Sequence, residues 1–150
     1  MGQSIIRKAN SSDIDALVEL LTTLFTLETD FNSNTEFQKN GLSIMLERPK
    51  ECCILVAEYN NKVIGICTGQ LLISTAEGGL KLLVEDVVVN AEHRGCGVGT
   101  KLLSEIQKWA ISCGAKRMDL LADEGNTPAL NFYRKQNWYT TKLIALQKKL

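Results

Sequence analysis

The chain has 150 residues, and its 17 basic and 17 acidic side chains leave no net charge. A neutral chain has no overall field that would draw it to nucleic acid or to an anionic membrane, so neither partner is expected. The length suits one domain over residues 1–150, large enough to fold around a single core.

The cysteines indicate neither a disulfide framework nor a metal site. The chain has five cysteines, which form no Cys-x-x-Cys pair, and it has one histidine that could complete a metal site. Reduced thiols are typical of cytosolic proteins, and we find neither a secretory leader nor a run of about 20 apolar residues. We therefore expect a soluble, cytoplasmic protein without a metal.

The N-terminal part predicts one strand followed by two helices. Ser4 to Lys8 suggests a short strand, after which Ser11 or Ser12 can cap a helix with apolar residues at helical spacing. A polar segment from Thr26 to Thr35 leads into a weaker helix near Glu36 to Leu46.

Three antiparallel strands are expected next. Cys53 to Glu58 and Val63 to Leu72 are joined by Asn60-Asn61, a pair that tolerates left-handed conformations and suits a tight hairpin. Gly78-Gly79 then turns the chain into Lys81 to Val89.

The pattern then changes to helix, strand and helix. Apolar spacing predicts a helix from Val98, with Gly114 at its C-terminal cap. Met118 to Leu121 forms a fifth strand, which a right-handed crossover makes parallel to the fourth. Thr127-Pro128 fits an N-cap followed by proline, opening a helix through Lys135.

Two further short strands, 138–140 and 143–148, can close the sheet. The element order predicts an α/β (α+β) fold, whose mixed, mostly antiparallel sheet has a parallel central pair and flanking helices.

The segment from Val87 to Leu103 joins a β-branched strand to an amphipathic helix through Arg94 and three alternating glycines, Gly95, Gly97 and Gly99. Without Cβ atoms there, successive N–H groups can converge on an anion at the positive N-terminus of the helix. Arg94 adds a charge-assisted donor. A phosphate-binding loop is therefore predicted here.

Spacing separates three kinds of phosphate-binding loop. A Walker loop needs Gly-Lys-Ser/Thr, whereas Thr100 follows Gly99. A dinucleotide fingerprint needs a third glycine three residues after the second, and counting from Gly95 or Gly97 finds none. The remaining pattern, Arg-x-x-Gly-x-Gly from Arg94 to Gly99, resembles the pyrophosphate-binding signature of the GNAT superfamily of acyl-CoA N-acyltransferases.

A second segment, Asn126 to Trp138, resembles the other GNAT signature, in which an Asn, an Ala and a Phe-Tyr pair precede a Gly-Phe turn. Asn137 and Trp138 replace that Gly-Phe. Asparagine accepts a left-handed conformation and tryptophan retains an aromatic plug, so the fold tolerates the departure.

The resemblance implies acetyl-CoA as the donor, with the pyrophosphate on the loop amides and no metal. In the family the fourth and fifth strands splay apart, which leaves N–H groups for the pantetheine and the thioester carbonyl. The cofactor-binding residues implied are Val87, Val88, Val89, Arg94, Gly95, Cys96, Gly97, Val98, Gly99, Thr100, Asn126 and Tyr133. Asn126 also fits a helix cap.

Three residues are candidates for proton transfer. By resemblance Tyr133 is the acid beside the departing sulfur, with packing against Phe132 as the alternative. Glu85 matches a position where several GNAT enzymes carry a base or a water-relay glutamate, and Asp86 is the second choice. Strand alternation places Glu85 and Asp86 on opposite faces, and ion pairing or solvation are their alternatives.

Other polar residues are weaker candidates. His93 is expected to have a surface or adenosine-side role, and Cys96 lacks an activating histidine. The remaining candidates are Asp123 and Glu124 after the fifth strand, and Glu28, Asp30 and Phe31 as the lining of an amine pocket.

The resemblance implies an N-acetyltransferase that moves an acetyl group from acetyl-CoA to a primary amine of a small molecule, by direct attack in a ternary complex. Two alternatives remain: a protein or peptide N-acetyltransferase, and a non-catalytic acyl-CoA-binding sensor. A homodimer is also compatible with the sequence.

Overall fold

The computed structural model describes residues 2–27 and 34–150. The chain divides into two compact units, Met1–Asp119 and Leu120–Leu150. The elements up to the end of the sheet are β1 (Ile5–Lys8), η1 (Ser11–Asp13), α1 (Ile14–Leu27), α2 (Thr35–Leu46), β2 (Cys52–Tyr59), β3 (Lys62–Ser74), β4 (Gly79–Val89), η2 (Ala91–His93), α3 (Val98–Ser112) and β5 (Met118–Leu120). The second unit contains α4 (Thr127–Lys135).

The strands form one mixed sheet in the order β1-β2-β3-β4-β5. The first four strands pair antiparallel, and Asn60 and Asn61, both with positive φ, make the β2–β3 hairpin. The Lys116 N–H donates to the Leu80 carbonyl, and the Leu82 N–H donates to the Arg117 carbonyl, each at 2.9 Å. Residue numbers therefore rise in the same direction along both strands, and β5 runs parallel to β4, as expected for the fold class.

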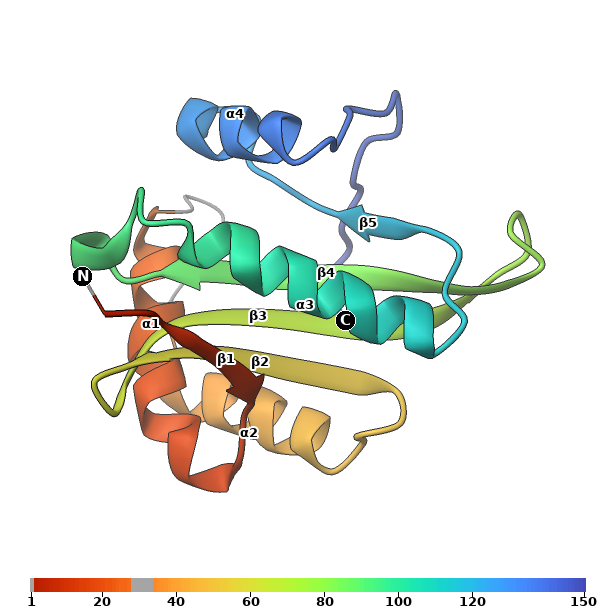
Figure 1. The fold of residues 1–150 in the computed structure, drawn as a ribbon. Helices are drawn as coiled ribbons and strands as arrows, with labels where there is room; N and C mark the ends of the chain where they lie inside the picture. The colour runs from red at the N-terminus through yellow and green to blue at the C-terminus, as the bar shows by residue number, and fades with distance from the viewer. Residues whose placement is uncertain (1, 28–33) are drawn as a thin grey trace. The chain divides into compact units, whose positions relative to one another are not determined.

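The helices of the first unit cover both faces of the sheet (Figure 1). On one face, α1 and α2 enclose an apolar cluster made by Leu17, Val18, Leu20, Leu21, Leu42, Ile54, Val56, Ile66 and Val88. On the other face lies α3, whose Leu102 and Ile106 approach Gly65 and Gly69 of β3. A Cβ on Gly69 would come within 2.9 Å of Leu82, so this glycine lets Leu82 pack beside Ile106.

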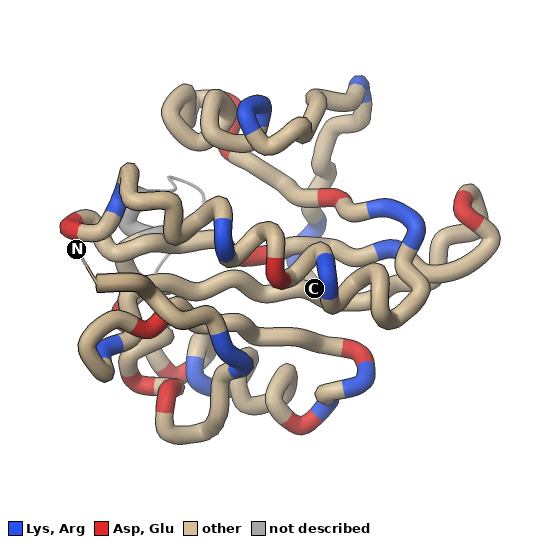
Figure 2. The backbone as a smooth tube through the Cα atoms, in the orientation of Figure 1, with Lys and Arg blue, Asp and Glu red and all other residues tan. Residues whose placement is uncertain are grey.

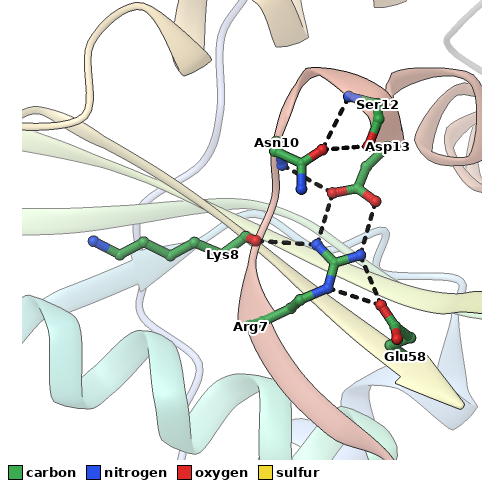
Figure 3. A network of polar contacts seen from close by, with 6 residues as sticks. All are labelled: Arg7, Lys8, Asn10, Ser12, Asp13 and Glu58. Carbon is green, nitrogen blue, oxygen red and sulfur yellow. Dashed lines mark hydrogen bonds and ion pairs between the residues drawn. The ribbon is translucent and has the colours of Figure 1, made fainter. Parts of the chain in front are cut away.

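An ion network joins β1, β2 and η1 (Figure 3). The Arg7 guanidinium donates two bonds of 2.8 and 2.9 Å to Asp13 and a third, of 2.8 Å, to Glu58. Hydrogen bonds from Arg7 hold the pKa of the buried Asp13 carboxyl below its usual range. Asn10, rather than the expected Ser11 or Ser12, caps η1, because its side chain and that of Asp13 form a capping box.

Charged residues of both signs lie among the turns of the first unit (Figure 2). Within the described parts of the chain, no helix is long and apolar enough to cross a membrane.

In the second unit, α4 has the expected bounds but a different cap. The Asn126 side chain accepts a bond of 3.2 Å from the Ala129 N–H, so Asn126 is the N-cap and Thr127 already lies in the helix. Asn137 has φ 66°, the left-handed conformation expected of the asparagine that replaces glycine in the Asn126 to Trp138 signature.

The two closing strands expected at 138–140 and 143–148 are not formed, and the structure has irregular backbone there. Leu143, Ile144 and Leu146 are at least 80% exposed. The β-forming composition of this segment was therefore misleading, because a strand also needs a partner and a buried face.

Candidate active site

The loop between β4 and α3 is shaped by two left-handed glycines. Gly95 has φ 74° and Gly97 has φ 81°, and a Cβ on either would meet no atom of the described residues within 4 Å. The backbone conformation, rather than crowding, therefore favours glycine here. Gly97 is the N-cap of α3 and makes no side-chain cap hydrogen bond, so this residue places no side-chain acceptor in competition with an anion at the positive end of the helix.

Arg94 is attached to the end of the preceding strand. Its Nε donates a bond of 3.0 Å to the Val89 carbonyl, while Asn90 caps η2 by accepting from the Glu92 N–H at 2.9 Å. The guanidinium is thus held beside the glycine loop. Backbone donors, a helix N-terminus and an arginine together form the type of site that binds a phosphate or pyrophosphate group.

A β-bulge interrupts β4 beside the predicted catalytic carboxylates. Gly69 of β3 pairs with Val84, and Cys67 pairs with Val87. Thr68 alone therefore lies opposite two residues, Glu85 and Asp86. An inserted residue of this kind reverses the facing of the strand beyond it.

The bulge changes which face each β4 residue occupies. Val84 pairs with Gly69 on the α3 face, whereas Val88 belongs to the cluster under α1 and α2. Without the bulge, these two valines would share a face.

Asp86 contacts Thr68 on the α1/α2 face, and Glu85, next after Val84, also points away from α3. The expectation that Glu85 and Asp86 face opposite sides was wrong, because simple alternation fails at a bulge.

Asp86 is held tightly. Thr68, which is fully buried, donates to the Asp86 carboxylate at 2.8 Å and accepts from the Asp86 N–H at 3.1 Å. Burial raises the pKa of Asp86, and the Thr68 hydrogen bond partly offsets that rise.

Glu85 is exposed as a whole residue, yet burial of its carboxyl, followed by the nearby charge of Asp86, raises its pKa. The direction of this shift suits a general base, because it brings the pKa closer to neutral pH.

The bulge also directs the backbone groups at the end of β4. The Asn90 N–H donates to the Ile64 carbonyl of β3 at 2.8 Å, and Val88 pairs with Ile66 in the same register. Backbone groups alternate in direction along a strand, so those of Val87 and Val89 point away from β3. The Val89 carbonyl accordingly accepts from Arg94.

Two predicted residues belong to the second unit. Asn126 is the cap of α4, which establishes its structural role. The Tyr133 ring lies 5.4 Å from that of Phe132 and 6.1 Å from that of Trp138, centroid to centroid, so it also packs as an aromatic.

The weaker candidates have structural surroundings of their own. The His93 ring packs on Tyr59 at 5.5 Å, and the exposed Cys96 thiol lies 3.7 Å from the Arg94 carbonyl. Burial raises the pKa of Cys53 to about 11, which leaves it a protonated thiol at neutral pH. Glu28, Asp30 and Phe31 lie outside the described residues. Among residues 2–27 and 34–150, no three His, Cys, Asp or Glu side chains are grouped to hold a metal.

Sequence reasoning missed Thr68. Nothing in the sequence marks this residue, because threonine is common in strands. Only the strand register shows that Thr68 lies opposite Glu85 and Asp86.

The model of the acetyltransferase (GNAT) family matches residues 14–138. The chain therefore belongs to this family of enzymes, whose donor is acetyl-CoA.

Individual proteins agree with that assignment. The uncharacterized N-acetyltransferase YobR of Bacillus subtilis is 30% identical over 63% of this chain and 36% of its own length. The mouse thialysine N-epsilon-acetyltransferase is 26% identical over 89% of this chain and 83% of its own length. A crystal structure of a possible acetyltransferase from Clostridium difficile shares the fold, with a TM-score of 0.85 at 19% identity and 99% of each chain covered.

The match covers only part of some relatives. It spans about a third of YobR and 64% of the length of several other curated relatives.

Proposed function

We propose that this protein is an N-acetyltransferase that moves the acetyl group of acetyl-CoA to a primary amine of a small molecule, by direct attack in a ternary complex. The observation that carries the proposal is the order of features along one stretch of chain. The bulge with Glu85 and Asp86, the outward backbone groups of Val87 and Val89, and the Arg94 to Gly99 loop follow one another directly.

The donor would be bound mainly by backbone. The amides from Gly95 to Thr100 and the Arg94 guanidinium would hold the pyrophosphate, while Cys96 and Val98 contribute main-chain groups rather than side chains. Val88 is buried and would serve through its position in the strand. When bound, acetyl-CoA supplies the activated acetyl group.

The N–H groups of Val87 and Val89 would donate to the thioester carbonyl, where negative charge develops during attack. Such donors, fixed before the reaction, stabilise the transition state more than the ground state.

The acceptor would lie on the face of β4 that carries Glu85 and Asp86. A primary amine is largely protonated at neutral pH and must lose a proton before it attacks. Glu85 would remove that proton, directly or through water, and Asp86 would add the negative charge that attracts a cationic amine. The mouse relative is named a thialysine N-epsilon-acetyltransferase, and that name is in keeping with a small-molecule acceptor.

Tyr133 would protonate the departing thiolate, and Asn126 would contact the cofactor. Both assignments are supported by their places in the Asn126 to Trp138 signature. A phenol remains protonated at neutral pH and can therefore donate to a thiolate.

The proposal is tested by incubating the protein with acetyl-CoA and separate panels of amino acids, polyamines, amino sugars and peptides. Acetylation of a small amine supports the proposal. Acetylation confined to peptides would instead identify a protein acetyltransferase.

A further inference from the structure

Thr68 is the one β3 residue opposite the two bulged residues of β4, and its hydroxyl is fully engaged. Its single proton goes to the Asp86 carboxylate at 2.8 Å, and its oxygen accepts the Asp86 N–H at 3.1 Å. In a regular ladder an amide facing β3 finds a backbone carbonyl, so here a side chain serves as the acceptor that closes the bulge.

We propose that Thr68 is the positioning residue of the acceptor site: its hydroxyl closes the β4 bulge and fixes Asp86 beside Glu85 on one face. The inference rests on the proposed function, because that face is where the amine would bind. Thr68 itself is fully buried and acts through Asp86.

The Thr68 hydroxyl affects the ionisation of Asp86 as well as the position of its side chain. The described side chains of α1 within the apolar cluster on this face are Leu17, Val18, Leu20 and Leu21, which offer no hydrogen bond. Among the described residues, the Asp86 charge raises the pKa values of Glu85 and Cys67. The Thr68 hydroxyl therefore supports the ionised form of Asp86 against the effect of burial.

Two substitutions separate the hydroxyl from the shape of the side chain. Thr68→Val keeps the branched shape and removes the hydroxyl, whereas Thr68→Ser keeps the hydroxyl and is the matched control. Without its donor, the Asp86 carboxylate loses a charge-assisted hydrogen bond in a buried place.

The first measurement is an NMR titration of the Asp86 carboxyl carbon, which needs no substrate. We expect the midpoint in Thr68→Val to rise by about one pH unit, and the midpoint in Thr68→Ser to stay near that of the original chain. An unchanged midpoint in Thr68→Val, or equal shifts in both variants, would overturn the proposal.

The second measurement is steady-state kinetics with whichever amine is acetylated. We expect Thr68→Val to lower kcat/KM for the amine about tenfold at neutral pH, while KM for acetyl-CoA changes less than twofold and Thr68→Ser restores the rate. An equal loss in both variants, or a matching rise in KM for acetyl-CoA, would identify a packing role and overturn the proposal.

If no amine is acetylated, the titration still decides the role of Thr68, and the proposed function fails separately. If Thr68→Val does not fold, Thr68→Ala removes the same hydroxyl without a second methyl group, and the same outcomes apply.

Discussion

The Arg94 side chain returns to the strand that precedes it, where its Nε donates to the Val89 carbonyl at 3.0 Å. One arginine thus links the end of β4 to the loop that begins α3. The contact uses Nε, so the side chain is anchored to the strand by its own hydrogen bond.

Arg94→Ala is expected to weaken coenzyme A binding about tenfold, because a charge-assisted donor to phosphate is lost. Binding of pantetheine, which carries no phosphate, should change little. Calorimetry with both ligands checks this expectation, and an equal loss for the two would mean that Arg94 serves only to hold the loop.

Gly97→Asp is expected to abolish coenzyme A binding, because a carboxylate would stand at the helix N-terminus where the pyrophosphate belongs. Gly97→Asn is the matched variant: it has the same size and tolerates φ 81° well, but carries no charge. Gly78→Asp places the same charge at a left-handed position of the β3–β4 turn, φ 66°, and should leave binding intact. Unchanged affinity in Gly97→Asp would contradict the loop's assignment.

Tyr133→Phe is expected to lower kcat by roughly 10²-fold, with little change in KM for acetyl-CoA, because the ring remains and the proton donor is lost. Rapid-mixing kinetics should establish that chemistry limits the rate. A wild-type kcat under those conditions would leave Tyr133 with its packing on Phe132 and Trp138 alone.

Glu85→Gln is expected to lower the acetylation rate most at low pH, where the amine is protonated. The rate should recover partly as the pH rises. Because burial raises the pKa of Glu85, we expect the acid limb of the unaltered enzyme to lie at a higher pH than an ordinary glutamate would give. Asp86→Asn should chiefly raise KM for the amine. A collapse of kcat in Asp86→Asn, beside an unaltered pH profile in Glu85→Gln, would exchange the two roles.

Asp13 and Asp86 should affect stability with opposite dependence on pH. Hydrogen bonds from Arg7 lower the pKa of Asp13, so its contribution is complete above the unfolded value near 4 and is lost as pH falls through the folded pKa. Burial raises the pKa of Asp86, so its ionisation costs stability that is regained as pH falls through the folded pKa toward the unfolded one.

At pH 7, Asp13→Asn should lower the free energy of unfolding by about 2 kcal/mol, whereas Asp86→Asn should not lower it. Denaturant titrations at pH 7 and near pH 3 check both expectations. A loss in Asp13→Asn that is just as large near pH 3 would contradict the role of the carboxylate charge.

Local sequence predicted most of this fold because its elements carry local signals. The apolar spacing from Val98, the Asn60-Asn61 turn and the helix ending at Lys135 all appear where they were expected. The prediction of strands at 138–140 and 143–148 was wrong, because the composition matches a strand but the sequence does not show whether a partner strand is present.

The candidate site was less predictable for the same reason. The glycine loop is contiguous, so its spacing is visible in the sequence. The bulge is a property of two paired strands: nothing around Glu85 announces an inserted residue, and Thr68 lies in a different strand. The shared facing of Glu85 and Asp86 therefore required the register.

The most direct test of the account is mass spectrometry of amine panels after incubation with acetyl-CoA and the protein. We expect one class of small primary amine to acquire an acetyl group, with release of free coenzyme A in equal amount, and Gly97→Asp to yield neither product. Tight binding of coenzyme A without acetylation of any small amine would contradict the account and leave an acyl-CoA-binding sensor or a protein acetyltransferase.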